Sequence, residues 1–258
     1  MGLIKKALCV TALTLLSSTM TLSAAETNKE VRTSHPVASA VLMDAYRYLG
    51  ALDKFSFDAI TTNEDIYRNE MMISYTHNVH ADLQRPNKLH IDIVGDIKNR
   101  SYYLYNDIFT MYDYDHKVYI NLQADENIDK TLDHLFEKFN IKTVLANLLY
   151  TDLDKRVAPK DNGYYFGMTK VDGSVCHHIG FTNETRELQV WIENSETPLI
   201  KKFAIIDKSD KFKPRSATIL RWDLEAHFTD KDFFFKVPQG AAQISVCLLY
   251  TSPSPRDS

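Results

Sequence analysis

Glycine and cysteine are both scarce in this chain, which has 8 glycines and 3 cysteines among 258 residues. So few glycines argue against a linker-rich chain, and the 13 phenylalanines and 14 tyrosines favour an ordered, aromatic-rich β protein. Two of the cysteines lie near the ends, so Cys176 alone remains in the middle of the sequence. We therefore expect no internal disulfide, and the stability has to come from an ordinary hydrophobic core.

Long apolar runs are confined to the N-terminus. Lys5 and Lys6 precede an apolar stretch over residues 7–16, and small residues lead to Ala25, which is the pattern of a signal peptide over residues 1–25. The apolar stretch is too short to span a bilayer as a helix, although a membrane anchor is the alternative. No later run reaches about 18 apolar residues, so the sequence predicts an exported chain with no membrane span after cleavage.

The chain also lacks a basic tract, since 34 acidic against 30 basic side chains give a formal net charge of −4. This balance argues against binding to nucleic acid or to an anionic membrane surface. Catalytic motifs are missing as well: the sequence contains no G-x-S-x-G, no H-E-x-x-H, no phosphate-binding loop and no G-x-G-x-x-G. We predict no catalytic residue, no metal site and no cofactor.

The two ends of the chain do not belong to the predicted domain. Residues 247–257 (CLLYTSPSPRD) match, in order, the translation of a transposon-type sequencing adapter. We therefore expect residues 247–258 to be a non-native tail, and the alternative is a genuine Pro/Ser-rich C-terminus. The polar residues 26–34 are expected to be frayed. Residues 35–246 remain as a single domain, long enough to bury one substantial core.

A period of two dominates that domain. Residues 170–207 divide into four strand runs with turns at 172–173, 183–185 and 194–198, and in the third run the apolar residues Leu188, Val190 and Ile192 alternate with their neighbours. Four consecutive antiparallel strands form a meander. Further strand runs between Phe55 and Leu122, and another from Arg215, extend the sheet to about ten strands, a size at which sheets tend to curl.

Two segments break this pattern with helical spacing. The first follows Pro36 and ends near Leu52, and the second is a pair of helices over about 127–140 and 143–149. The sequence thus predicts a mainly β (α+β) fold: a single large curved antiparallel sheet, or half-barrel, with the N-terminal helix and the mid-chain helical pair on its concave face. The apolar stripe of the second segment consists of Ile128, Leu132, Leu135, Phe136 and Phe139.

Several stretches resemble known families. Residues 85–89 (RPNKL) resemble the R-P-N-x-(F/L) motif of the periplasmic lipoprotein carriers and outer-membrane receptors of the Lol system (LolA and LolB), and residues 103–114 resemble their following hairpin. Residues 171–179 (VDGSVCHHI), 189–193 and 198–202 resemble the DUF2092 family of predicted periplasmic proteins, over roughly residues 38–245. This resemblance implies a LolA-like half-barrel located in the periplasm of a Gram-negative bacterium.

The resemblance also implies a function. In the carriers the arginine of this motif helps to hold a helical lid over a cavity for acyl chains, a role that would fall to Arg85. We accordingly predict a monomeric, non-enzymatic protein that binds a lipid acyl chain or a lipoprotein in a hydrophobic half-barrel. The candidate binding and lid residues are Arg85, Leu89, Ile91, Ile93, Leu132, Leu135, Phe136, Phe139, Trp191 and Trp222.

Other readings remain open. Arg85 could instead be a surface arginine at a strand end, and the two tryptophans could serve core packing. Residues 176–178 (Cys-His-His) could form a metal or nucleophile site, and the alternative is an ordinary strand with one buried thiol. The whole protein could be a structural or accessory envelope protein with a packed core and a protein partner, or, as a third reading, a hydrolase that uses His and Asp. A connected cavity under the helices would separate the first reading from the second.

Overall fold

The computed structural model describes residues 35–245, except for 69, 140–144 and 157–161. The chain divides into two units, Met1–Arg32 and Thr33–Ser258, and only the second contains described residues. The predicted signal peptide (1–25), the polar segment 26–34 and the predicted tail (247–258) lie outside the described residues. Among the helices that are described, none is long and apolar enough to cross a membrane.

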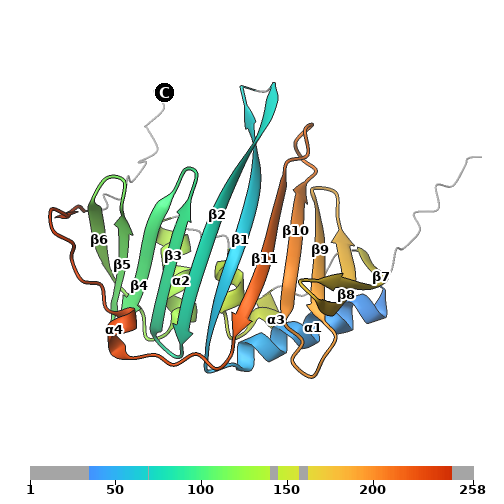
Figure 1. Cartoon of the computed structure of the whole chain (residues 1–258), viewed down its shortest axis with the longest axis horizontal. Coiled ribbons are helices and arrows are strands. Elements are labelled where there is room, and N and C mark those ends of the chain that lie inside the picture. The colour runs from blue at the N-terminus through green and yellow to red at the C-terminus, as the bar shows by residue number, and fades with distance from the viewer. Residues whose placement is uncertain (1–34, 69, 140–144, 157–161, 246–258) are drawn as a thin grey trace, which may run out of the picture. The chain divides into compact units, whose positions relative to one another are not determined.

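A 12-stranded sheet forms the body of this unit, with the order β12-β6-β5-β4-β3-β2-β1-β11-β10-β9-β8-β7 (Figure 1). Neighbouring strands are antiparallel, except that β12 runs parallel to β6. The sheet is open, because β12 and β7 lie at opposite edges. The strands are β1 (Lys54–Tyr67), β2 (Met71–Gln84), β3 (Lys88–Gly95), β4 (Asn99–Tyr105), β5 (Ile108–Asp113), β6 (Val118–Gln123), β7 (Asn162–Val171), β8 (Ser174–Thr182), β9 (Arg186–Glu193), β10 (Ile200–Asp207), β11 (Arg215–Asp223) and β12 (Ala242–Gln243).

α1, α2, α3 and the 3-10 helix η1 pack on one face of the sheet. The other face also carries apolar groups, among them Trp191 and Tyr103, and Tyr103 packs against Phe235. In Figure 1 these four helices lie behind the strands, with α1 crossing the lower ends of the second half of the sheet, whereas α4 lies at the lower left beside β3 and β4. α1 packs on β7, β8 and β9 and on α3, while α2 packs on the 3-10 helix η1. The helices are α1 (Pro36–Ala51), α2 (Ile128–Phe139), η1 (Ala146–Leu149), α3 (Leu153–Arg156) and α4 (Asp230–Phe233).

Strand alternation explains which side chains meet the helices. On β3, Leu89, Ile91 and Ile93 belong to the main core, and the residues between them face the other way. The register places Leu89 beside Leu83 of β2 and Ile91 beside Ala81, so the apolar residues of adjacent strands form continuous rows under the helices. Burial of these rows is expected to supply most of the stability, since Cys176, the one cysteine among the described residues, is free.

The fold class was predicted correctly, and the deviations lie at the ends of elements. The first helix begins without a side-chain hydrogen bond from its N-cap residue, His35. Of the second helix of the predicted pair, the described part is the short η1, and a further turn, α3, lies in the stretch 150–163 that the sequence predicts to be a loop. Three of the four residues of α3 are charged, and Leu153 is its one buried residue. A single apolar residue shows no helical period, so the sequence could not predict this helix.

Candidate functional site

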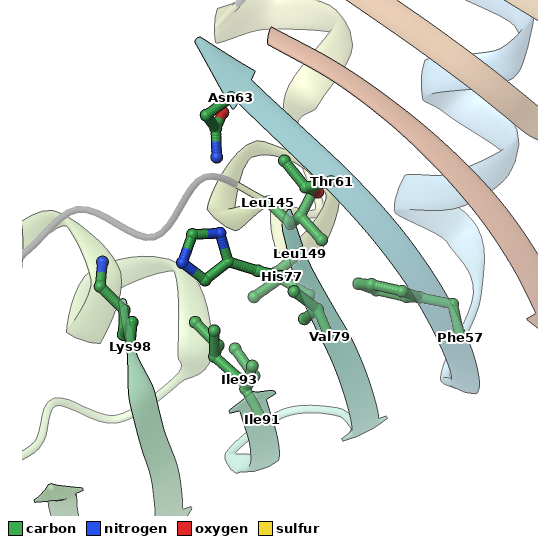
Figure 2. Close-up of a pocket in the computed structure, with 10 residues that line it drawn as sticks. All are labelled: Phe57, Thr61, Asn63, His77, Val79, Ile91, Ile93, Lys98, Leu145 and Leu149. Atoms are coloured by element: carbon green, nitrogen blue, oxygen red, sulfur yellow. The ribbon is translucent and has the colours of Figure 1, made fainter. Parts of the chain in front are cut away.

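A pocket of about 60 Å³ lies between the concave face of the sheet and the helices above it. We call α2, η1 and α3 together the helical cover. Strands β1, β2 and β3 form its wall, and the segment around η1 closes it from the helical side (Figure 2). Since strand residues two apart share a face, one row of each strand lines the space. The lining residues are Phe57, Thr61, Asn63, His77, Val79, Ile91, Ile93, Lys98, Leu145 and Leu149.

Polar and apolar residues occupy different ends of this pocket. The apolar end is formed by six side chains, among them Phe57, Ile91 and Leu149, all of which belong to the main core. The polar end carries Thr61, Asn63, His77 and Lys98 (Figure 2). The arrangement is amphipathic, and no acidic side chain is among the lining residues.

His77 is the most unusual group at the polar end. It is only 8% exposed, and its Nε2 atom has no hydrogen-bond partner. Burial, and next the positive charge of Lys98, lower the pKa of His77, although Asp96 acts in the opposite direction. Its imidazole therefore favours the neutral form at neutral pH. A buried polar atom without a partner costs free energy, and a ligand atom that bonded to His77 Nε2 would remove that cost.

Arg85 ties the helical cover to the rest of the structure. It follows β2 and is largely buried, with 10% of its side chain exposed. Its Nε donates to the Leu52 carbonyl oxygen at 2.8 Å, and its Nη1 donates to the Leu149 carbonyl oxygen at 2.9 Å. Nη1 also lies 3.9 Å from Asp129 Oδ1 of α2. One guanidinium thus contacts the end of α1, the end of η1 and the first turn of α2.

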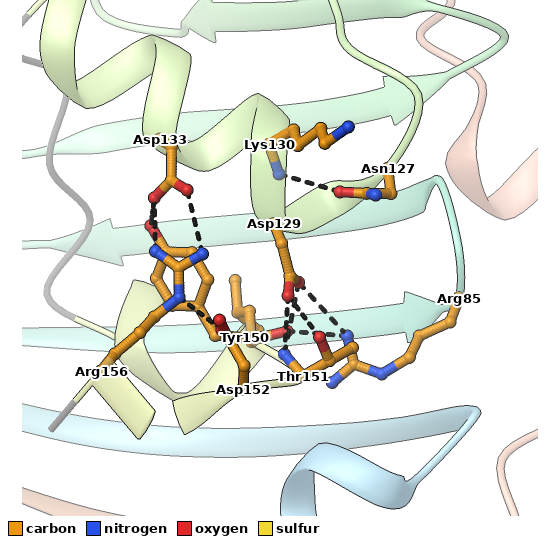
Figure 3. Close-up of polar contacts among 10 residues, drawn as sticks. Arg85, Asn127, Asp129, Lys130, Asp133, Tyr150, Thr151, Asp152 and Arg156 are labelled. Carbon is orange, nitrogen blue, oxygen red and sulfur yellow. Dashed lines mark hydrogen bonds and ion pairs between the residues drawn. The ribbon is translucent and has the colours of Figure 1, made fainter. Parts of the chain in front are cut away.

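Two carboxylates of α2 complete this junction. Asp129 accepts a hydrogen bond from the Thr151 backbone N–H at 3.0 Å and another from the Thr151 hydroxyl. One helical turn later, Asp133 accepts two hydrogen bonds from Arg156, at 2.7 and 2.9 Å (Figure 3). Residues four apart lie on one face of a helix, so both carboxylates point to the η1–α3 segment. Ion pairing with Arg156 lowers the pKa of Asp133.

The structure brings only some of the predicted residues to this site. Ile91 and Ile93 line the pocket, and Leu89, Leu132 and Leu135 are buried in the adjoining core. Phe139 packs against that core, and Trp222 lies on the same face, in contact with Phe55 and Phe57. Arg85 lies beside the cover rather than on the surface, as described above.

Phe136 and Trp191 are corrections to the predicted set. Phe136 is 47% exposed, because the apolar stripe of α2 is broader than the surface that it covers. Trp191 packs with Cys176 and Ala204 in a second, separate cluster and stacks on His178. It lies between Val190 and Ile192, which both face the main core, so alternation turns its ring to the opposite face.

The Cys-His-His segment forms no metal site in the described structure. Cys176 is a fully buried thiol, and burial, followed by the negative charge of Glu193, raises its pKa. His177 lies on the other face, where its ring nitrogens contact Tyr165 Oη and Asn194 Oδ1. Within residues 35–245, outside the three undescribed gaps, no three Cys, His, Asp or Glu side chains are grouped to hold a metal ion.

The sequence did not predict the polar end of the pocket, which contains His77 and Lys98. His77 and His80 are an odd number of positions apart on β2, so their side chains fall on opposite faces of the strand, but this spacing does not tell which face the helices cover. Lys98 lies in the turn after β3, where charged residues are ordinary. The signal that was available is the apolar row that continues from Val79 into His77 on the same face.

Comparison with solved structures finds distant similarity only. LprF from Mycobacterium bovis is 13% identical, with a TM-score of 0.46 and coverage of 81% of this chain and 99% of that chain. Lipoprotein LppX from Mycobacterium tuberculosis is 13% identical, with a TM-score of 0.43 and coverage of 75% and 99%. A LolA superfamily protein from Nitrosomonas europaea is 12% identical, with a TM-score of 0.33 and coverage of 77% and 97%. At these scores the description of the fold rests on the strands and helices of this chain itself.

Sequence comparison gives a more definite result. The model of DUF2092, described as a predicted periplasmic protein, matches residues 38–247. No curated protein matches the sequence. The matched range contains every described helix and strand except the first two residues of α1.

Proposed function

Because the chain belongs to the DUF2092 family of predicted periplasmic proteins, we propose that it binds the acyl chain of a lipid or lipoprotein, without catalysis, in the periplasm of a Gram-negative bacterium. The binding site is the space between the concave face of the sheet and the cover formed by α2, η1 and α3. The bound form is a monomer with its apolar ligand held away from water.

One observation carries this proposal: an apolar pocket lies beneath helices that are fastened by a few polar contacts. Ile91, Ile93 and Leu149 offer hydrocarbon surface to an acyl chain. Arg85 holds the cover through two backbone carbonyl groups and one carboxylate. Such contacts can break and reform without unfolding the sheet, whereas a cover fixed only by interdigitated apolar side chains would open at a much higher cost.

The size of the pocket implies that the cover has to move. A cavity of about 150 Å³ accommodates a benzene molecule, and the pocket here holds about 60 Å³. An acyl chain is larger than benzene, so the structure corresponds to a closed form. We propose that α2 and η1 swing away from the sheet when the chain enters.

A fluorescent fatty-acyl probe tests the proposal directly. We expect saturable binding to the wild type and a loss of about tenfold or more in Ile93→Trp, because the larger indole fills the pocket. Val94→Trp is the matched control: Val94 is the next residue on the same strand but is 56% exposed on the opposite face. The melting temperature of each variant separates a blocked pocket from a damaged fold.

A structural or accessory envelope protein is the second candidate, and the small volume of the pocket favours it. If the helices complete a packed core, the probe will not bind to any variant, and Ile93→Trp will only destabilise the protein, by about 1–3 kcal/mol through overpacking. A wild type that shows no saturable binding would therefore leave this candidate in place and remove the carrier proposal.

A further inference from the structure

Three side chains that can donate a hydrogen bond, those of Asn63, His77 and Lys98, converge at the polar end of the pocket. Thr61 of β1 lies directly opposite His77 of β2 in the strand register, and Asn63 is the next residue of β1 on the same face. Lys98 comes from the turn after β3 and lines the same space (Figure 2). The convergence involves three chain segments, so it is a property of the fold and not of one strand.

The donors are available because the neighbouring acceptors are already used. The Asn63 side-chain oxygen accepts a hydrogen bond from the Ser216 hydroxyl at 2.7 Å, which leaves the amide N–H groups for the pocket. The Thr61 and Thr218 hydroxyls bond to each other at 2.9 Å. His77 Nε2 is buried without a partner. Within the described part of the chain, Lys98 forms no ion pair with a carboxylate.

Among the residues that line the pocket, Lys98 is the one charged side chain. Asp96 is the acidic group that acts on His77, and its Oδ2 atom is already bonded to the Thr76 backbone N–H at 2.8 Å. Asp96 keeps its negative charge in that hydrogen bond, but no described carboxylate forms an ion pair with Lys98, and burial together with Arg100 lowers the pKa of Lys98. Arg100 is itself paired with Asp113, at 2.9 Å. A half-buried cationic group without an ion-pair partner is stabilised by an anion that arrives with the ligand.

Gly95 shows that the space for the imidazole is shaped by the backbone. It lies opposite His77 in the register of β2 and β3, and a Cβ atom added to it would lie 2.6 Å from His77 Cδ2. The same Cβ atom would lie even closer to the Thr76 backbone carbonyl oxygen, so a larger residue would displace the backbone of β2 together with the ring. The position of His77 at the pocket thus depends on a residue that has no side chain.

We propose that the ligand is an anionic amphiphile whose oxyanion head, a carboxylate or a phosphate, is held by Asn63, His77 and Lys98, while its acyl chain extends toward Phe57 and Leu149. This inference rests on the proposed acyl-chain function and names the ligand class for that site. Neutral lipids of the same chain length lack the charge that the polar end requires.

Matched ligands test the head-group site. A fatty acid, its methyl ester and an alkyl phosphate of the same chain length compete with the fluorescent probe, all below the concentration at which micelles form. We expect the wild type to bind the acid about tenfold more tightly than the ester, which is the contribution of one charge-assisted hydrogen bond. The alkyl phosphate tells whether a carboxylate or a phosphate is the preferred head, and inorganic phosphate tells whether the oxyanion binds without a chain.

Two variants locate the effect. Lys98→Met keeps the length of the side chain and removes its charge, so we expect the preference for the acid to disappear while the ester binds as before. Lys202→Met is the matched control, because Lys202 lies over the Trp191 ring, away from the pocket. In His77→Leu we expect weaker acid binding with an unchanged or higher melting temperature, since the variant removes a buried nitrogen that has no partner.

The outcomes separate this inference from the function on which it rests. Equal affinities of the wild type for acid and ester would overturn the head-group site and leave acyl-chain binding in place. An unaltered preference in Lys98→Met would overturn it as well. If neither ligand displaces the probe because nothing binds, both the site and the proposed function fall.

Discussion

His90 and His77 show how differently one residue type behaves on the two faces of the sheet. His90 stacks on Tyr103, with ring centroids 4.4 Å apart, and its Nε2 lies 3.2 Å from Asp92 Oδ2. Burial on its own would lower the pKa of His90, but Asp82 and Asp92 override that effect and raise it to about 9. For His77, burial and the charge of Lys98 outweigh the single carboxylate of Asp96, so its pKa shifts in the opposite direction. His90 is thus a charged structural residue, and His77 is a neutral one beside the pocket.

The ionisation of His90 predicts a pH-dependent contribution to stability. Because its pKa is raised in the folded state, the contribution is fully present below about 6.5, the ordinary value, and is lost as the pH rises through about 9. The pKa values of Asp82 and Asp92 are lowered in the folded state, so the stability that these two carboxylates contribute is lost as the pH falls below their ordinary value of 3.8. We expect His90→Gln to cost about 1–2 kcal/mol at pH 5.5 and much less at pH 9.5.

Urea unfolding of both proteins at several pH values measures this difference. His116→Gln is the control, since His116 pairs with Asp113 at an exposed turn and should change the free energy of unfolding by less than about 0.5 kcal/mol. A cost for His90→Gln that stays constant from pH 5.5 to 9.5 would mean that packing on Tyr103, not charge, explains the role of His90.

At the scale of elements, helix α2 separates core residues from cover residues. Leu135 is buried in the main core, and Phe136, its neighbour, is 47% exposed. We expect Leu135→Ala to cost about 2–5 kcal/mol and Phe136→Ala less than about 1 kcal/mol, because truncation costs most where neighbouring atoms cannot fill the space. The denaturant midpoints of the two variants compare these losses. A larger loss in Phe136→Ala would indicate that α2 is rotated about its axis in solution.

Arg85 predicts a local effect in the same region. Arg85→Leu leaves the Leu52 and Leu149 carbonyl groups without their donor, which should cost about 2–3 kcal/mol. We expect amide hydrogen exchange to become faster in α2 and η1 and to stay unchanged in the strands far from them, such as β9. Asp44→Asn, which breaks the exposed ion pair with Arg47 on α1, is the control, with an expected cost below about 0.5 kcal/mol. Faster exchange across the whole sheet would show that Arg85 supports the fold rather than the cover.

These elements also show what the sequence could predict. Alternation on β3 and the helical stripe from Ile128 to Leu135 specify faces, and both were predicted correctly because each pattern repeats over several residues. η1 and α3 have four residues each, too few for a period to emerge. The partners of Arg85 are two backbone carbonyl groups and a carboxylate far away in the sequence. Every residue has a backbone carbonyl group, so the sequence could not identify these partners. Which of the two histidines on β2 is covered depends on tertiary packing.

At the scale of the molecule, one strand pair joins the two halves of the sheet. The first half, from β1 to β6, contains the strands of the pocket, and the second half, from β7 to β11, contains Cys176. The pair β1–β11 connects them, with eight residues of each strand in register from Ser56 to Asn63. If this junction makes the unit cooperative, a ligand in the first half has to stabilise the second half as well.

Labelling of the Cys176 thiol reports on this cooperativity. Cys176 is fully buried, far from the pocket in the register of the sheet, and therefore reacts with a thiol reagent only after β8 and β9 open. In a chain in which Cys247 is replaced by Ser and the predicted signal peptide is removed, we expect an acyl ligand at 100 times its dissociation constant to slow labelling about 100-fold, equal to about 2.7 kcal/mol. Ile93→Trp, with its pocket filled, should show no such protection. Wild-type labelling that is unaffected at saturating ligand would mean that the second half opens independently, and that the twelve strands unfold as two units rather than one.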